Sequence, residues 1–217
     1  MTSSELPDRA HSRPPATVRH ADVVVIGAGL AGALTAAILG RAGYGVVLVD
    51  VHAVYPPDFR VEKIAGEQVA LMRRLGFLDA FAASATRVDE IVNAASGRVL
   101  DRTFGEHYSI LYGDIVRVAR AQIPPSVTFI VGRVADIETS SERQRITMSG
   151  GDVIEARLAV LATGQGDVLR QKLGMNRRVV FRSSPSPSAS RSARMVPPLA
   201  SRRSPTMASI LGIASTT

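Results

Sequence analysis

The hydrophobic pattern is clearest near the N-terminus, where short apolar runs alternate with glycine-rich turns. Residues 22–26, Asp-Val-Val-Val-Ile, form a β-branched run that is typical of a strand buried on both faces. Three closely spaced glycines follow, and residues 33–41 are rich in alanine and leucine, which favours a helix. A second apolar run at residues 46–49 ends in Asp50. The pattern predicts a strand–helix–strand unit with parallel strands.

The rest of the chain predicts shorter elements. Residues 51–60 contain a Pro-Pro pair and are typical of a loop, whereas residues 88–110 predict a β-hairpin that turns at 95–97. Helical spacing is seen in three segments, at residues 61–81 with a break at Gly76, at 111–123 and at 168–173. Short strands are expected at residues 127–131, 134–138, 144–148, 152–156 and 158–161.

Composition changes at both ends of the chain. Residues 1–20 contain three prolines and no apolar centre, so they predict a flexible leader rather than a secretory signal. Residues 179–217 are rich in serine, proline and arginine and lack acidic residues, which predicts a disordered tail. A single folded α/β domain is therefore expected at residues 21–178.

The net charge of +7 does not describe the folded part of the chain. The last acidic residue is Asp167, so residues 168–217 carry 9 basic and 0 acidic side chains. Residues 1–167 carry 17 basic and 19 acidic side chains. Nucleic-acid binding requires lysine and arginine clustered on structured elements. We therefore expect no nucleic-acid partner.

Several other classes of protein are not expected from this sequence. Residues 23–40 are 18 uncharged and mostly apolar positions, long enough for a membrane span. Four glycines interrupt this run, and Asp22 and Arg41 border it, so we expect no membrane span. The chain has no cysteine, which excludes disulfides and agrees with a cytoplasmic location. Its four histidines are scattered along the sequence, so neither a metal site nor a Ser/His/Asp triad is expected.

The three glycines between the first strand and the helix form a G-x-G-x-x-G motif. Gly27 allows a tight turn, Gly29 lets the backbone approach a pyrophosphate, and Gly32 lets the helix pack close to the strand. The helix N-terminus then presents unpaired N–H groups to the phosphates. Asp50 lies 18 positions past Gly32, near the spacing expected for a carboxylate that binds ribose hydroxyls. Together these residues predict a dinucleotide-binding site.

Two later stretches distinguish between NAD and FAD. After the second strand come Arg60 and then residues 62–76, Glu-Lys-Ile-Ala-Gly-Glu-Gln-Val-Ala-Leu-Met-Arg-Arg-Leu-Gly, where a plain NAD domain would continue with further βαβ units. Residues 161–174, Leu-Ala-Thr-Gly-Gln-Gly-Asp-Val-Leu-Arg-Gln-Lys-Leu-Gly, form the second stretch. Both resemble FAD-dependent monooxygenases and halogenases, the aromatic hydroxylase-like flavoproteins. The resemblance implies an α/β, Rossmann-like FAD-binding fold with a small β-hairpin and β-meander insertion.

The resemblance also implies roles for individual residues. The glycine loop would surround the pyrophosphate of FAD, Asp50 the adenosine ribose and Arg60 the phosphate side, unless Arg60 is a surface arginine beside Asp58. Thr163 stands where the family has an aspartate, and Arg170 could serve either a salt bridge or the cofactor. The backbone of Val134 would contact the adenine. The expected cofactor-binding residues are Gly27, Ala28, Gly29, Leu30, Ala31, Gly32, Asp50, Val51, Arg60, Val134, Ala162, Thr163 and Gly164.

By the same resemblance, FAD reduced by NAD(P)H would oxygenate or halogenate a small organic substrate. In the family the chain continues with a Gly-Asp motif for the ribityl chain and a sheet that covers the substrate, and neither follows Gly174 here. We therefore expect a product truncated or frameshifted after about residue 178, with weak or no FAD retention. Two classes stay open: an FAD-dependent oxidoreductase, which a partner chain could complete, and a non-catalytic dinucleotide-binding remnant or module. No catalytic residue is assigned.

Overall fold

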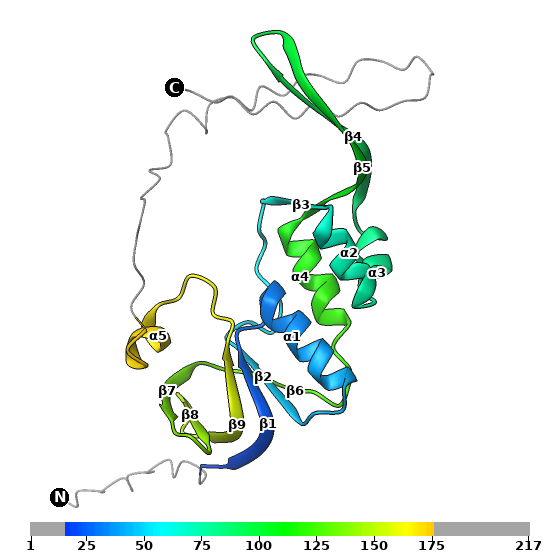
Figure 1. Ribbon diagram of the computed structural model, residues 1–217. Coiled ribbons are helices and arrows are strands. Elements are labelled where there is room, and N and C mark those ends of the chain that lie inside the picture. Colours follow the sequence, from blue (N-terminus) through cyan, green and yellow to red (C-terminus); the bar gives the residue numbers. More distant parts are fainter. Residues whose placement is uncertain (1–15, 176–217) are drawn as a thin grey trace, which may run out of the picture. The chain divides into compact units, whose positions relative to one another are not determined.

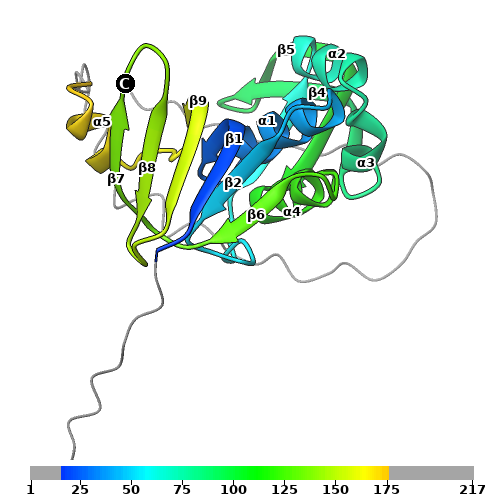
Figure 2. The ribbon, with the colours of Figure 1, turned by 90° about the horizontal axis from the view of Figure 1, so that it is seen from below.

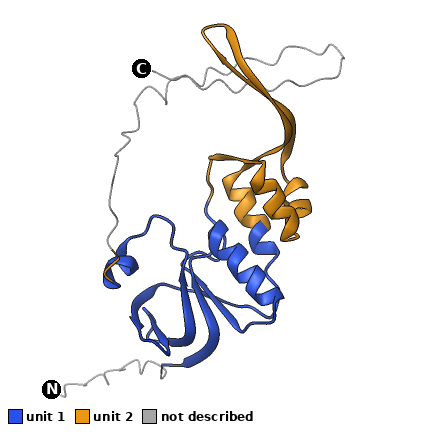
Figure 3. Cartoon of the chain, viewed as in Figure 1, with its two compact units in different colours: residues 1–56, 119–173 blue, residues 57–118, 174–217 orange. Residues whose placement is uncertain are grey.

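The computed structural model describes residues 16–175, which form two compact units (Figure 3). Unit 1 holds the described residues 16–56 and 119–173, and unit 2 holds 57–118 with 174–175. The predicted leader lies mostly, and the predicted tail entirely, outside the described residues. The domain boundaries expected above therefore stay predictions.

Unit 1 is built on a six-stranded sheet in the order β6-β2-β1-β9-β8-β7 (Figures 1 and 2). Neighbouring strands among β6, β2, β1 and β9 pair in parallel, whereas β8 and β7 continue the sheet as an antiparallel meander. The elements of this unit are β1 (Val18–Ile26), α1 (Leu30–Arg41), β2 (Val46–Asp50), β6 (Thr128–Val131), β7 (Val134–Thr139), β8 (Gln144–Met148), β9 (Val153–Leu161) and α5 (Val168–Lys172).

The side chains of β1 alternate between two hydrophobic clusters on opposite faces of the sheet. Val25 is fully buried in the cluster that includes Ala36 of α1. Val24 is also fully buried, in the cluster that includes Ile154 of β9 and Leu169 of α5. The prediction of a strand covered on both faces is confirmed, and this double burial holds the end of β1 rigidly in place.

The long apolar run at residues 23–40 divides between the end of β1, a turn and α1. Because α1 has 12 residues, it is much shorter than a membrane span. Within residues 16–175, no helix is long and apolar enough to cross a membrane.

Unit 2 contains a three-stranded antiparallel sheet in the order β3-β5-β4. Its elements are β3 (Val61–Ala65), α2 (Glu67–Arg74), α3 (Leu78–Ala82), β4 (Thr86–Ala95), β5 (Arg98–Leu111) and most of α4 (Tyr112–Ala121). Strands β4 and β5 form the predicted hairpin, which extends past α2 and α3 (Figure 1). Ser96 and Gly97 have φ angles of 50° and 76°, as a tight hairpin turn requires.

Two of the expected elements are wrong. Residues 61–65 continue the helical spacing of the segment after them, but they form strand β3, which pairs with β5. Gly66, at a φ of 50°, separates this strand from α2. The two short strands expected at 152–156 and 158–161 are one strand, β9, because its parallel pairing with β1 extends along nearly its whole length.

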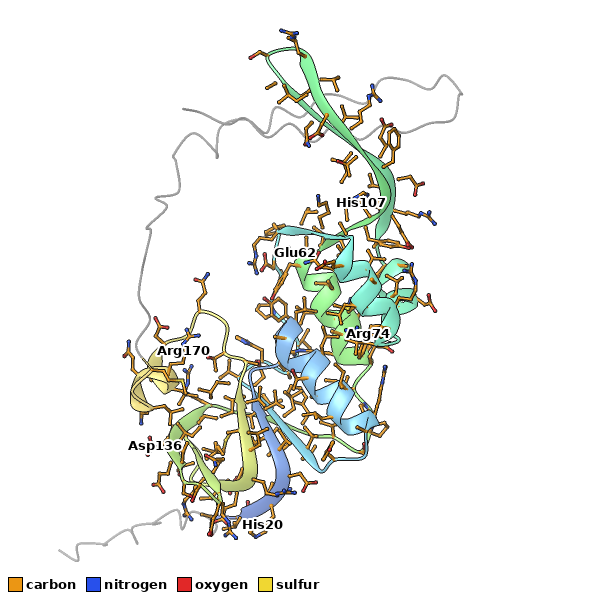
Figure 4. The ribbon with its side chains drawn as sticks, viewed as in Figure 1. His20, Glu62, Arg74, His107, Asp136 and Arg170 are labelled. Atoms are coloured by element: carbon orange, nitrogen blue, oxygen red, sulfur yellow. The ribbon has the colours of Figure 1, made fainter. Side chains whose placement is uncertain are left out.

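An exposed ion pair holds α5 on the edge strand β7, at Asp136, which is labelled in Figure 4. Lys172 Nζ lies 2.6 Å from Asp136 Oδ1 and 3.0 Å from the carbonyl oxygen of Ala135. Two hydrogen bonds lower the pKa of Asp136 below its ordinary value: the larger effect comes from Lys172 and the smaller from the backbone N–H of Ile137. A lowered pKa means that the pair stabilises the folded state above the unfolded pKa, and that this contribution is lost as pH falls through the folded pKa.

We therefore expect Asp136→Asn to lower the melting temperature by about 1–2 °C at pH 7. The difference from the wild type should narrow as the pH falls through the lowered pKa of Asp136, because the wild-type carboxylate then becomes protonated. Differential scanning fluorimetry from pH 2.5 to 8 measures this change. Glu142→Gln removes one exposed charge that has no ion pair within the described part of the chain, so it is the matched control. A pH-independent difference would contradict the prediction.

Candidate functional site

The G-x-G-x-x-G segment, here called the glycine loop (Gly27–Gly32), connects β1 to α1. Gly27 has a φ of 103°, which only glycine adopts readily, and its N–H donates to the carbonyl oxygen of Val49 over 2.7 Å. A Cβ added at Gly27 would overlap the carbonyl oxygen of Ala162. The first glycine is therefore required by the fold itself.

The other two glycines of the loop lie in contrasting surroundings. A Cβ at Gly32 would overlap the carbonyl oxygen of Gly27 and lie 3.1 Å from Cβ of Ala162. A Cβ at Gly29 would have no atom of the described chain within 4 Å, and the φ of Gly29 is an ordinary −67°. The fold therefore requires glycine at position 32 but not at position 29. Open space above Gly29 is what the close approach of a phosphate requires.

The N-terminus of α1 opens onto the same space. Gly29 is the N-cap residue, so no side chain of the described residues caps the helix, and its first turn contains no acidic residue. The N–H groups at the start of a helix have no intrahelical acceptor, and the helix dipole places partial positive charge there. This end of α1 can therefore bind an anion through backbone N–H groups.

Asp50 ends β2 beside the glycine loop. Its Oδ2 accepts the N–H of Ala28 over 2.6 Å, and its Oδ1 accepts the N–H of His52 over 2.8 Å. The side chain is only 13% exposed. Each carboxylate oxygen has a further lone pair, so Asp50 can still accept hydrogen bonds from two hydroxyl groups. Val51, between Asp50 and His52, is exposed.

Arg120, near the end of α4, is a site residue that the sequence reasoning missed. Its Nε donates to the carbonyl oxygen of Ala28 over 2.7 Å, and its Nη1 donates to those of His52 and Ala53 over 3.0 and 3.1 Å. Its Nη2 lies 3.7 Å from Oδ2 of Asp50. The helical pattern could have indicated it, because Arg120 lies four residues after Val116, which is fully buried, on the apolar side of a predicted helix. A charged residue at such a position is buried only when it has partners.

The turn at residues 162–164 adjoins the glycine loop. The N–H of Ala162 donates to the carbonyl oxygen of Ile26 over 2.8 Å, which continues the pairing of β9 with β1. The hydroxyl of Thr163 donates to the carbonyl oxygen of Gly166 over 3.2 Å, so it closes its own turn. Gly164 has a φ of 59°, in the left-handed region. The residue that departs from the family's aspartate thus has a structural role in this turn.

The segment leading to Val134 meets the site through the backbone. The N–H of Gly132 donates to the carbonyl oxygen of Asp50 over 2.7 Å, and Val134 begins β7 two residues later. Parallel strands bring their carboxyl ends to the same edge of a sheet. The ends of β1, β2, β6 and β9 therefore gather the glycine loop, Asp50, Val134 and the 162–164 turn in unit 1. Ligands of open α/β sheets bind at this edge.

Two arginines have other partners. Arg60 lies in unit 2, where its Nη2 is 2.8 Å from Oδ2 of Asp58 and its guanidinium lies 4.2 Å from the ring centre of Tyr112. The side-chain hydrogen bond from Arg60 lowers the pKa of Asp58. These contacts agree with the alternative of a surface arginine. Arg170 forms an ion pair with Asp167 at 2.6 Å, which agrees with a salt bridge as its role. Among residues 16–175, no cluster of three or more potential ligands could hold a metal ion.

A comparison with protein families decides what kind of site this is. The family model described as FAD binding domain matches residues 20–181, which is most of the chain. The chain belongs to this family of FAD-binding domains. The expected fold class and the resemblance to flavin-dependent monooxygenases are thereby confirmed, and the glycine loop of this FAD-binding domain lies inside the matched region.

Relatives of this FAD-binding domain are longer proteins. A flavin-dependent monooxygenase from Legionella longbeachae is 24% identical over 161 residues, which cover 70% of this chain and 41% of that protein. The 6-hydroxynicotinate 3-monooxygenase from Bordetella bronchiseptica is 24% identical over 163 residues, which cover 70% of this chain and 43% of that protein. The chain therefore spans less than half the length of these relatives.

Solved structures show the same fold. The p-nitrophenol 4-monooxygenase from Pseudomonas putida matches with a TM-score of 0.66 at 20% sequence identity. That match covers 73% of this chain and 44% of the Pseudomonas chain. The FAD-binding domain described here therefore shares its architecture with one part of a larger enzyme.

Proposed function

We propose that this chain binds the ADP half of FAD within a flavoprotein monooxygenase. The observation that carries the proposal is the open, uncapped start of α1 beside Gly29, at the strand ends that also hold Asp50. Backbone N–H groups of the loop residues Gly29 to Gly32 would bind the pyrophosphate, since the N–H of Ala28 donates to Asp50. The carboxylate of Asp50 would accept the ribose hydroxyls, and residues at the other strand ends would border the adenine and the phosphates.

The full set of proposed cofactor-binding residues is the one expected from the sequence. Twelve of these residues lie in unit 1, and Arg60 alone lies in unit 2. A role for Arg60 toward the phosphates therefore stays a prediction, as does the backbone contact from Val134 to the adenine. Arg120 joins the set because it contacts both the glycine loop and the segment after β2.

FAD supplies the redox chemistry of such an enzyme, since it can be reduced by a nicotinamide cofactor and can then react with oxygen. The residues of this chain bind and orient the cofactor. NAD(P)H as the reductant, a small organic substrate, a cytoplasmic location and a partner chain that completes the site are further parts of the proposal. Catalytic residues are not assigned among the described residues.

A second candidate is a dinucleotide-binding module without catalysis. This candidate is favoured because all the proposed cofactor-binding residues are assigned to the ADP half of FAD. None of them is assigned to enclose the flavin ring. Flavin chemistry depends on that enclosure, because the protein excludes water and competing reactions there. The two candidates differ in NAD(P)H oxidation by the FAD-loaded chain in the presence of oxygen: a monooxygenase-type protein consumes NAD(P)H, and a module does not.

We expect the purified chain to show no flavin absorption band and to bind added ADP and FAD with similar, weak affinities. The reason is that only the ADP half contacts assigned residues, so the flavin ring adds little binding free energy. Isothermal titration calorimetry with ADP, FAD and riboflavin measures this, and riboflavin, which lacks the ADP half, is the control. Affinity for FAD more than about tenfold above that for ADP would contradict the half-site. Absence of ADP binding would contradict the proposed function.

A further inference from the structure

We infer that Arg120 is a positioning residue that prepares Asp50 for the ribose hydroxyls of the dinucleotide. The inference rests on the proposed function and adds to it a residue outside the glycine motif. Arg120 acts through Asp50 and through the backbone of the glycine loop. Its side chain is only 13% exposed, and its guanidinium binds backbone carbonyls of the protein.

The guanidinium connects two loops that are separated in the sequence. One carbonyl that it binds, that of Ala28, belongs to the glycine loop after β1. The other two, those of His52 and Ala53, belong to the loop after β2. A planar guanidinium has five N–H donors in a fixed geometry, so it can hold three carbonyls at once, which a lysine ammonium on a flexible stem would do poorly.

Asp50 is held from the same two segments. Its carboxylate accepts the N–H of Ala28 and that of His52, so Ala28 and His52 each contact Asp50 through the N–H and Arg120 through the carbonyl oxygen. Asp50 and Arg120 therefore both form hydrogen bonds with the backbone of Ala28 and of His52. Loss of the guanidinium would release these residues and with them the orientation of the Asp50 carboxylate.

One donor of the guanidinium has no hydrogen-bond acceptor. Nη2 of Arg120 is buried and makes no hydrogen bond within the described residues, although Oδ2 of Asp50 lies 3.7 Å away. Aromatic side chains of the loop after β2 and of β6 border the guanidinium, since its carbon lies 5.8 Å from the ring centre of Tyr55 and 5.6 Å from that of Phe129. A buried donor without an acceptor is costly. The nearest acidic oxygen to this donor is Oδ2 of Asp50, so the ion pair links Arg120 to the carboxylate that it is proposed to position.

The same helix offers a matched control. Arg117 lies one turn before Arg120 on α4, its side chain is 66% exposed, and it forms an ion pair with Asp114 at 3.1 Å. Arg117→Met and Arg120→Met remove the same charge from the same helix and replace it with the same side chain. A difference between the two variants therefore reports the contacts of Arg120 and not the change in net charge.

The experiment titrates the full chain with ADP and with 2′,3′-dideoxy-ADP, which lacks the hydroxyls proposed to bind Asp50. We expect the wild type and Arg117→Met to prefer ADP by about tenfold. In Arg120→Met the affinity for ADP should fall about tenfold, and the preference for ADP should shrink to within about twofold. A residue with only a structural role would weaken both ligands equally and leave the preference intact. That outcome, or unchanged binding, would overturn the inference.

Amide hydrogen exchange separates this inference from the proposed function. If Arg120 holds the two segments, the N–H groups of Ala28 and His52 should exchange at least about tenfold faster in Arg120→Met than in Arg117→Met. If the wild type binds no ADP, the proposed function fails, and the exchange rates still decide whether Arg120 positions Asp50. Equal exchange rates in the two variants would overturn the positioning role of Arg120. Should Arg120→Met fail to fold, Arg120→Lys takes its place, with a smaller loss expected in both measurements.

Discussion

Replacement of Gly32 by alanine is expected to destabilise unit 1 by about 3 kcal/mol or more and to abolish dinucleotide binding. The new Cβ would overlap the carbonyl oxygen of Gly27 and lie 2.9 Å from its carbonyl carbon. These are backbone atoms at the end of a strand buried on both faces, so no side-chain rotation can relieve the overlap. Relief requires α1 to move away from β1, and this movement displaces the glycine loop.

Thermal unfolding and ADP titration measure this effect, and we expect the melting temperature to fall by roughly 10 °C. Gly150→Ala is the control for the glycine-to-alanine change. A Cβ at Gly150 would have no atom of the described chain within 4 Å, and its φ lies outside the left-handed region. We expect this control to melt and bind as the wild type does. A Gly32→Ala variant that melts within about 2 °C of the wild type would show that α1 does not pack this closely on β1.

Gly29→Ala should leave stability nearly unchanged and still lower dinucleotide affinity by at least about 30-fold. A Cβ at position 29 points into open space, and the φ of −67° suits alanine, so the fold has no reason to exclude it. A pyrophosphate bound at the start of α1 would exclude alanine at position 29, because the added methyl group would occupy the space through which the phosphate approaches.

The contrast between stability and binding makes Gly29→Ala the sharper test of function. We expect its melting temperature to lie within about 2 °C of the wild type, while calorimetry with ADP and FAD shows the loss of affinity. A weakened affinity for adenosine by the same factor would assign the effect to the ribose side, whereas unchanged adenosine binding would assign it to the phosphates. Full ADP affinity in Gly29→Ala would place the pyrophosphate elsewhere and contradict the proposed site.

The central part of the site could be predicted from the sequence because its determinants are local. The glycine loop needs only a strand, three glycines at fixed spacing and a helix, and the structure shows all of these within residues 18–41. Asp50 could be predicted for a similar reason, since it ends a short apolar strand that pairs in parallel with the first. Backbone geometry at a turn depends on neighbouring residues, so the sequence pattern was sufficient for this part.

Other features depended on contacts between residues far apart in the chain. Residues 61–65 have a helical pattern, yet they pair with residues 107–111 and form a strand, because tertiary pairing outweighs local preference. Arg120 contacts Ala28, a separation of 92 positions, so no spacing rule could connect them.

The sequence by itself determined the family, the fold class and the position of the phosphate-binding turn. Only the tertiary structure decided which glycine the fold needs and which it leaves open, because that depends on the atoms that a Cβ would meet. It also showed that Arg60 has local partners and that Arg120 reaches the glycine loop. A long arginine side chain can extend toward many partners, and the packing of the surrounding elements selects among them.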